Sequence, residues 1–125
     1  MPLMELELVY RQVAGAVVAE LTAGRVADER DATDLVGNAA FGGARFVMLG
    51  AEMLAPEFFD LSTGLAGTVL QKFSTYRLIL VVVGYNANQA SESMLALIRE
   101  SNRGGVAWFV ADEAEALARV AGFGG

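Results

Sequence analysis

The stretch Leu78-Ile-Leu-Val-Val-Val83 is aliphatic throughout and mostly β-branched, and it is bounded by Arg77 and Gly84. Such a run is typical of a central strand in a parallel sheet, because both faces of that strand are covered. It is far shorter than the roughly 20 residues that a membrane span requires. The run therefore predicts an interior β-strand, around which the other elements are arranged.

The segments on either side of this strand alternate between strand and helix patterns. Further strands are expected over 4–14, 15–22, 45–49 and 106–110, and helices over 31–41, 91–100 and 112–120. A further helical region is expected over 56–73, and its second part runs from Leu65 to Phe73. The resulting order, ββαβαβαβα, requires right-handed crossovers and hence a mixed, mostly parallel sheet of four or five strands flanked by helices. We expect one α/β domain over residues 1–125.

Turn and cap residues support these boundaries. Ala14-Gly15 is suited to a tight turn between the first two strands, which would form a hairpin. Asp31 is expected to cap the first helix. Asp112, followed three residues later by Glu115, has the spacing of a capping box at the last helix. The residues from Gly122 to Gly125 are expected to form a frayed tail.

Composition excludes several classes of chemistry. The chain of 125 residues has no cysteine and no histidine, so it lacks thiolate ligands, cysteine nucleophiles and the commonest neutral-pH base. We therefore expect no metal, no cofactor and no enzymatic activity. The net charge of −6 does not favour nucleic acid or an anionic membrane as a partner. Glu5 and Glu7 stand where a signal peptide would be apolar, so we expect a cytoplasmic protein.

Ser62, Thr63 and Gly64 lie at the expected start of a helix. Their hydroxyls could accept backbone N–H bonds as caps. Alternatively, a phosphoryl group on Ser62 or Thr63 would meet the positive end of the helix dipole, which makes such a junction a candidate switch. Gly64 and Gly67 would allow close approach either of a neighbouring helix or of a partner.

Glu57 and Asp60 are three residues apart and would share a face of a helical turn. Two such acids are suited to the helix dipole, although paired carboxylates can also perform acid–base chemistry or bind a hard cation. Lys72, farther along the same segment, is interpreted as ordinary helix surface.

Two later segments are candidate ligand or partner loops. Tyr85 and Asn86 follow the central strand, at the edge of the sheet where ligands of such folds bind, although they are also plain turn residues. Glu100, Asn102 and Arg103 are suited to the end of a helix, with Arg103 as a possible ion-pair donor to a partner.

Several stretches together resemble a bacterial family of domains of unknown function, number 4180. They are Asp31-Ala-Thr-Asp-Leu35, Pro56-Glu-Phe-Phe-Asp-Leu-Ser-Thr-Gly-Leu-Ala-Gly67, Leu70-Gln-Lys-Phe73, Tyr76, Val83-Gly84 and Glu100-Ser-Asn-Arg-Gly104. The resemblance implies a small stand-alone bacterial protein and no assigned activity. Family members usually carry a lysine near Leu78-Ile79 and an acidic residue where Tyr85 stands, so a polar function that depends on that lysine and that acidic group is not expected here.

The junction Asp60-Leu-Ser-Thr-Gly-Leu65 also resembles that of STAS domains, the anti-sigma-factor antagonists and transporter tails, which read Asp-Ser-Ser-Gly-Leu. The resemblance aligns Ser62 with the serine that is phosphorylated in the antagonists and Thr63 with its neighbour. In this alignment Asp60 stands one position away from the aspartate of STAS domains, and the segment 56–60 is an insertion. It implies a STAS-like fold and a regulatory role.

Three functions follow, in order of preference. The first is a non-enzymatic regulatory or protein-interaction module, with another protein as partner and a homodimer as a possible form. The second is a small-molecule binding protein that uses Tyr85, Asn86 and the neighbouring loops. The third, a carboxylate enzyme, requires Glu57 or Asp60 to be buried in a cleft with a raised pKa.

Overall fold

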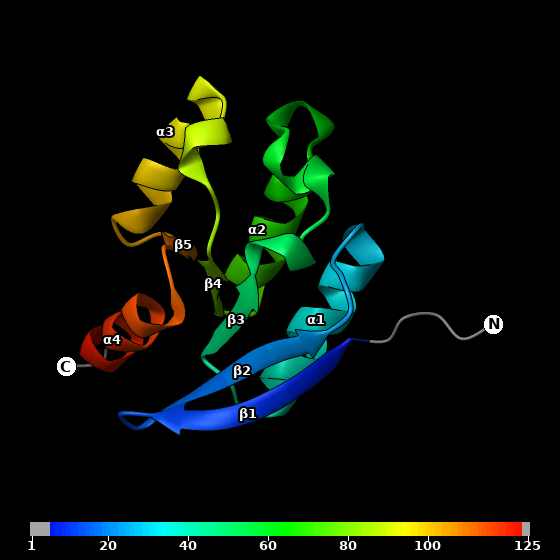
Figure 1. The fold of residues 1–125 in the computed structure, drawn as a ribbon. Helices are drawn as coiled ribbons and strands as arrows, with labels where there is room; N and C mark the ends of the chain where they lie inside the picture. The colour runs from blue at the N-terminus through cyan, green and yellow to red at the C-terminus, as the bar shows by residue number, and fades with distance from the viewer. Residues whose placement is uncertain (1–5, 124–125) are drawn as a thin grey trace.

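A five-stranded sheet forms the centre of the structure, a computed structural model that describes residues 6–123 (Figure 1). The strands lie side by side in chain order; the first pair is antiparallel and the later pairs are parallel. Their bounds are β1 Glu7–Val13, β2 Ala16–Ala23, β3 Phe46–Gly50, β4 Ile79–Val83 and β5 Ala107–Val110. Because β4 lies between β3 and β5, the prediction of an interior strand is confirmed.

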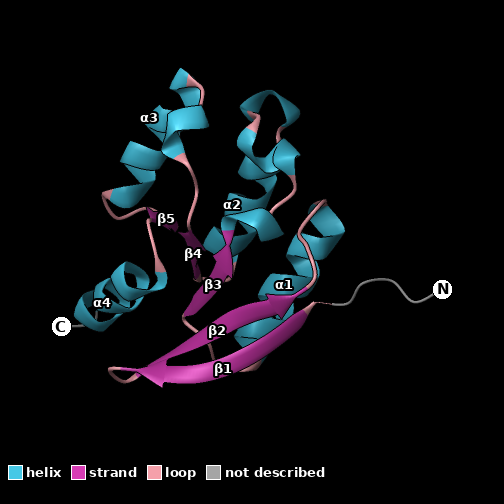
Figure 2. Cartoon of the chain, in the orientation of Figure 1, coloured by secondary structure: helices cyan, strands magenta, loops and turns pink. Residues whose placement is uncertain are grey.

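Helices cover both faces of this sheet (Figure 2). The α-helices are α1 Glu29–Phe41, α2 Leu65–Thr75, α3 Glu92–Asn102 and α4 Glu113–Phe123, and the 3₁₀ turns are η1 Ala51–Met53, η2 Pro56–Phe59, η3 Leu61–Thr63 and η4 Ala87–Gln89. Strands β2 to β5 follow one another across the sheet in chain order, so each connection crosses in the same direction. Right-handed crossovers then place α1, α2 and α3 on the same face. The other face is left to α4.

Two clusters of buried side chains follow from this arrangement. Side chains alternate along β4, with Leu80 in the cluster under α1, α2 and α3, and Val81 in the cluster under α4. Phe73 of α2 is fully buried in the first cluster, and Trp108 is buried in the second. The aliphatic composition of β4 is thereby explained, because water reaches neither of its faces.

The order ββαβαβαβα is confirmed, but the start of α1 differs from the prediction. Asp28, not Asp31, is the N-cap, and its carboxylate accepts the Asp31 N–H at 2.9 Å. Asp31 is the third helical residue and accepts the Ala27 N–H at 2.9 Å. The two acids satisfy donors reciprocally, so the prediction chose the wrong member of a capping pair.

The end of α4 also differs from the prediction, because the helix continues through Gly122 to Phe123 instead of fraying there. The Phe123 ring lies 5.5 Å from that of Phe46 and 5.4 Å from that of Trp108, and these contacts hold the last turn against the sheet. Residues 124–125 of the expected tail lie outside the described residues, as do residues 4–5 of the expected first strand.

The predicted hairpin turn and capping box are confirmed. Ala14 and Gly15 have φ values of 51° and 87°, as in a two-residue turn joining antiparallel strands. At α4, Asp112 accepts the Glu115 N–H at 2.8 Å, and Glu115 accepts the Ala111 N–H at 3.0 Å.

Candidate functional site

The corner that leads into α2 is built around the Thr63 hydroxyl. It donates to the carbonyl oxygens of Glu57 at 2.6 Å and Asp60 at 2.9 Å, and it accepts the Leu65 N–H at 3.2 Å. Gly64 follows with φ of 80°, a conformation that glycine adopts without strain. Thr63 therefore joins η2, η3 and α2, and the capping role that the sequence allowed for its hydroxyl is present.

Ser62 does not cap the helix; it binds Asp60 instead. Its hydroxyl donates to Asp60 Oδ1 at 2.6 Å, and its N–H donates to the same oxygen at 3.1 Å. The pKa of Asp60 lies below its ordinary value. The main cause is the hydrogen bond from the Ser62 hydroxyl, followed by the bond from the Ser62 N–H, and desolvation has a smaller, opposite effect. Both side chains are exposed, so this corner presents a carboxylate and a hydroxyl on the surface.

The pair Glu57 and Asp60 does not have the properties that acid–base catalysis would require. Both side chains are exposed, and the pKa of Asp60 is shifted down, whereas a carboxylic acid kept protonated for catalysis needs an upward shift. This direction argues against the carboxylate-enzyme interpretation.

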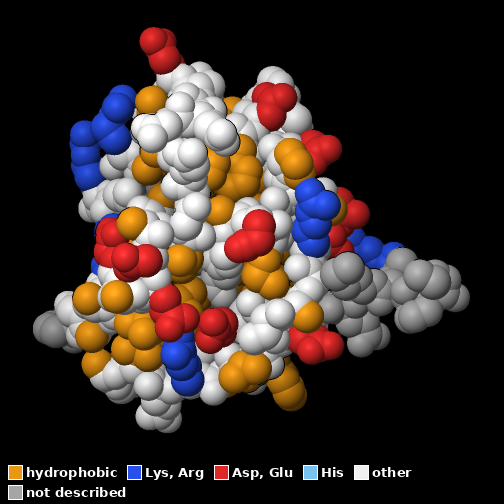
Figure 3. Space-filling view, in the orientation of Figure 1, with side chains coloured by type: hydrophobic (Ala, Val, Ile, Leu, Met, Phe, Trp, Pro, Cys, Tyr) orange, Lys and Arg blue, Asp and Glu red, His pale blue; other side chains and the backbone are white. Residues whose placement is uncertain are grey.

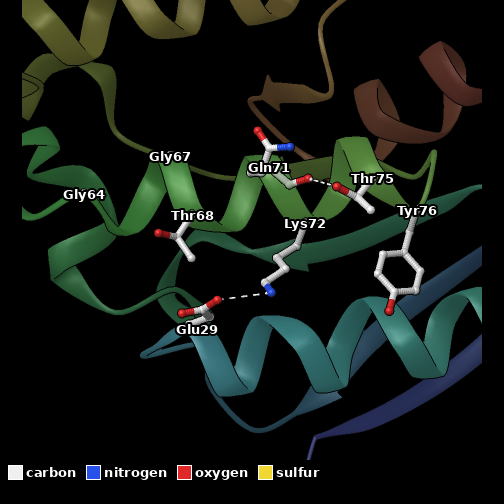
Figure 4. Close-up of a pocket in the computed structure, with 8 residues that line it drawn as sticks. All are labelled: Glu29, Gly64, Gly67, Thr68, Gln71, Lys72, Thr75 and Tyr76. Carbon is white, nitrogen blue, oxygen red and sulfur yellow. Dashed lines mark hydrogen bonds and ion pairs between the residues drawn. The ribbon is translucent and has the colours of Figure 1, made fainter.

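A groove of about 680 Å³ runs between α1 and α2, beside this corner (Figure 4). Lys72 Nζ lies 3.2 Å from Glu29 Oε2, so an ion pair joins its two walls. Tyr76 lies at the opposite end from Gly64, with its hydroxyl directed toward α1. The residues that line the groove are Glu29, Gly64, Gly67, Thr68, Gln71, Lys72, Thr75 and Tyr76.

The two glycines of the groove are open to the outside. Apart from the adjacent residues and the backbone of its own helix, a Cβ placed at Gly64 or Gly67 would have no described atom within 4 Å, and both residues are exposed. No helix packs closely on them, so the helix-packing explanation for these glycines is wrong. Gly64 is explained by its φ of 80°, whereas at Gly67 the open helix backbone is accessible to a molecule from outside.

Lys72 is one of several residues of this groove that are not among the candidates from the sequence. The sequence indicates ordinary helix surface at Lys72, but its side chain is only 28% exposed and pairs with Glu29 on a different helix. Periodicity could reveal that Lys72 lies away from the buried stripe of α2. It could not reveal which helix would lie opposite.

The candidate loop after β4 is largely engaged in contacts within the chain. The Tyr85 ring stacks on Phe59 with centroids 4.3 Å apart and planes inclined by 4°, and burial raises the pKa of its hydroxyl. Asn86 accepts the Asn88 N–H at 3.0 Å and so closes a local turn. These contacts weaken the small-molecule interpretation, because the Tyr85 ring and the Asn86 side-chain oxygen already have partners within the chain.

The end of α3 has a structural role that the sequence interpretation did not include. The Asn102 amide donates to the Phe109 carbonyl at 3.3 Å and accepts the Phe109 N–H at 2.8 Å, so it pairs with the outer edge of β5. Glu100 and Arg103 are exposed, and their backbones pair in the last turn at 3.2 Å. Asn102 is therefore not available to a ligand, whereas Glu100 and Arg103 are.

Within residues 6–123, no group of three or more Asp and Glu side chains is placed to hold a metal ion. No described helix is long and apolar enough to cross a membrane.

Comparison with known proteins gives two matches. The model of the family described as "Domain of unknown function (DUF4180)" matches residues 12–120. A search of curated proteins finds none that matches. Among solved structures, the chain is similar to the anti-sigma factor antagonist SpoIIAA in its unphosphorylated form, with 17% identity and a TM-score of 0.46 over 97% of this chain and 100% of that one.

Proposed function

The chain belongs to the family of domains of unknown function DUF4180, which assigns no activity, and we propose from the geometry of its surface that it is a non-enzymatic regulatory module that binds another protein. The proposed binding surface comprises the Ser62–Gly64 corner and the groove between α1 and α2. The observation that carries this proposal is the open, exposed backbone at Gly64 and Gly67 beside that groove.

The chemistry of the groove is suited to a polypeptide. Its walls combine hydroxyl and amide groups of Thr68, Gln71 and Thr75 with the ion pair of Glu29 and Lys72. The Tyr76 ring, 43% exposed, adds the aromatic surface that is enriched at protein interfaces. Glycines at one end let a partner's backbone approach within hydrogen-bonding distance of the helix surface.

Ser62 is the proposed point of regulation. Its side chain is exposed, and Ser62 lies two residues before Gly64, which lines the groove, so a kinase would reach it without unfolding the corner. A phosphoryl group there would add about −1.5 to −2 charges beside Asp60 and change the electrostatic potential of the binding surface. Thr63 is less suited to modification, because its hydroxyl already bonds two carbonyls.

The binding surface is tested by filling the groove. Tagged wild type, Gly67→Gln and Gly122→Gln are used to isolate complexes from the cells that make the protein, and the bound proteins are quantified by mass spectrometry. Both glycines are helical, exposed and without neighbours around an added Cβ, so the two changes are matched. We expect a wild-type partner to be lost with Gly67→Gln and kept with Gly122→Gln. Equal recovery with both variants would exclude the groove.

The switch is tested with the same partner and the variants Ser62→Asp and Ser62→Ala. We expect Ser62→Asp to weaken or strengthen binding at least about fivefold, because a fixed negative charge at the surface changes the interaction energy by about 1 kcal/mol. Its melting temperature should remain close to that of wild type. Binding that is insensitive to Ser62→Asp would remove the support for regulation at this position.

A further inference from the structure

The two edge strands of the sheet, β1 and β5, differ in whether their outer sides have hydrogen-bond partners. β5 is four residues long, and the Asn102 amide occupies the N–H and C=O of Phe109 on its outer side. β1 is seven residues long, and no element within residues 6–123 pairs with its outer side. An open edge strand is a template for another strand unless a protein blocks it. Within residues 6–123, one edge of the sheet is therefore blocked and the other is open.

The hairpin geometry defines which backbone groups β1 presents outward. Val13 and Ala16 flank the two-residue turn, and in such hairpins the flanking pair exchanges its backbone hydrogen bonds. Pairs two residues farther along do the same, so the residues between them point their N–H and C=O away from β2. Those outward-pointing residues are Leu8, Tyr10 and Gln12.

An observed hydrogen bond supports this assignment. Val17, the partner of Gln12 in β2, accepts the Arg45 N–H at 2.9 Å, so its carbonyl points away from β1. Gln12 must then direct its own backbone groups to the outer edge. The pairing with β2 is irregular only between Glu7 and Leu8, so the edge from Leu8 onward is regular.

We propose that two copies of this chain pair β1 with β1, antiparallel, about a twofold axis at Val9. This register sets Val9 opposite Val9 of the second copy, and Leu8 opposite Tyr10 of the second copy, with their outward backbone groups exchanging hydrogen bonds. Val9 and Tyr10 are 53% and 40% exposed in the single chain, and pairing would cover both. The proposal goes beyond the proposed function and does not depend on it.

Charge complementarity selects this register. It places Glu7 of each copy opposite Arg11 of the other, on the α4 face, so the axis forms the same ion pair twice. Arg11 Nη2 lies 3.5 Å from Glu20 and 3.4 Å from Glu113, so Arg11 already faces two carboxylates on this side of the hairpin, and Glu7 of the second copy would join them. Figure 3 shows acidic, basic and hydrophobic side chains close together over the β1–β2 hairpin.

The first test measures the oligomeric state by sedimentation equilibrium over about 10 μM to 1 mM, a range suited to a small interface. We expect wild type to form dimers and Val9→Lys to weaken the dimer at least about tenfold, since it sets two ammonium groups face to face. Ala96→Lys is the matched control, because it makes the same change from an apolar residue at an exposed position of α3. It should dimerise as wild type does.

The second test uses the absence of native cysteine. Val9→Cys should form a disulfide-linked dimer under mild oxidation, because the register brings its Cβ within disulfide reach of its own copy. Ala96→Cys should not. A wild type that stays monomeric throughout, or a Val9→Cys that cross-links no faster than Ala96→Cys, would overturn the proposal. So would a dimer that Val9→Lys leaves intact, as expected if β1 instead receives a strand from a different protein.

Discussion

Thr63 and Ser62 are adjacent and both exposed, yet their hydroxyls have different roles. Thr63 bonds two main-chain carbonyls and one N–H, whereas Ser62 bonds the Asp60 side chain. Removing Thr63 therefore loosens a chain corner, and removing Ser62 changes only a surface contact. The local sequence Ser-Thr-Gly does not reveal this division, because it depends on how η2 folds back toward α2.

The first prediction compares these two hydroxyls. Thr63→Val should lower the free energy of unfolding by about 1 kcal/mol, because the carbonyls of Glu57 and Asp60 lose their shared donor. Ser62→Ala should lower it by less. Urea denaturation of the two variants provides the measurement, and an equal or larger loss for Ser62→Ala would contradict the assignment of Thr63 as the structural member.

The second prediction concerns the Asp60 carboxyl, whose pKa lies below its ordinary value of 3.8 in the folded state. A lowered folded pKa adds stability above the unfolded value, and this contribution is lost as the pH falls through the folded pKa. Ser62→Ala removes the principal cause, so the pKa of Asp60 should rise toward 3.8 and the loss should begin at higher pH. Titration of the Asp60 carboxyl carbon by NMR measures this, and an unchanged pKa would contradict it.

At the scale of elements, the start of α2 has glycines in two different backbone states, one at the N-cap and one inside the helix. Gly64 has φ of 80°, whereas Gly67 lies within the helix and has space for a side chain. A glycine inside a helix costs stability relative to alanine, so its presence at Gly67 is consistent with a requirement for open backbone at the proposed binding surface.

The third prediction uses this contrast. Gly67→Ala should raise the free energy of unfolding by about 0.5–1 kcal/mol, because it restricts the unfolded chain without meeting any neighbour. Gly64→Ala should lower it by about 1 kcal/mol, because an L-residue is strained at positive φ. Thermal unfolding of both variants tests the pair, and a destabilising Gly67→Ala would show that this position is more crowded than described.

The fourth prediction also concerns an element, the outer edge of β5. Asn102→Asp keeps an acceptor for the Phe109 N–H but sets a carboxylate against the Phe109 carbonyl, so it should cost about 1–3 kcal/mol. Hydrogen exchange of the Phe109 amide should accelerate with it. Protection as strong as in wild type would mean that the Asn102 amide does not close this edge.

For the whole molecule, the sheet carries unequal layers, with three helices on one face and α4 on the other. The strands lie between the two buried clusters and contribute side chains to both. A domain of this size is expected to unfold cooperatively, so damage to either cluster should lower one common transition.

The fifth prediction tests this with one substitution in each cluster. Phe73→Ala should cost about 3–5 kcal/mol and Val120→Ala about 2 kcal/mol, because both side chains are buried. The double variant should show the sum within about 0.5 kcal/mol, since the sites lie on opposite faces of the sheet. Chemical denaturation followed by tryptophan fluorescence and by circular dichroism should give coincident curves. Separate transitions would indicate that the α4 layer unfolds independently.

Sequence patterns alone were sufficient for the order ββαβαβαβα, the interior position of Leu78–Val83, the turn at Ala14-Gly15 and the capping box of Asp112 and Glu115. Each of these depends on contacts between residues close in the chain, or on a periodicity of apolar side chains that states directly which faces are buried. The exposed corner at Ser62 and Thr63 was also located in this way, since hydroxyls before a helix have a local signature.

Only the tertiary structure decided which groups meet across the chain. The pairing of Lys72 with Glu29, the stack of Tyr85 on Phe59 and the contact of Asn102 with β5 all join residues of different elements. Periodicity indicates that a side chain lies on the outside of its own helix or strand, but not what is packed beside it. That is determined by the docking of α1 and α2 on one face of the sheet, which also makes the groove between them.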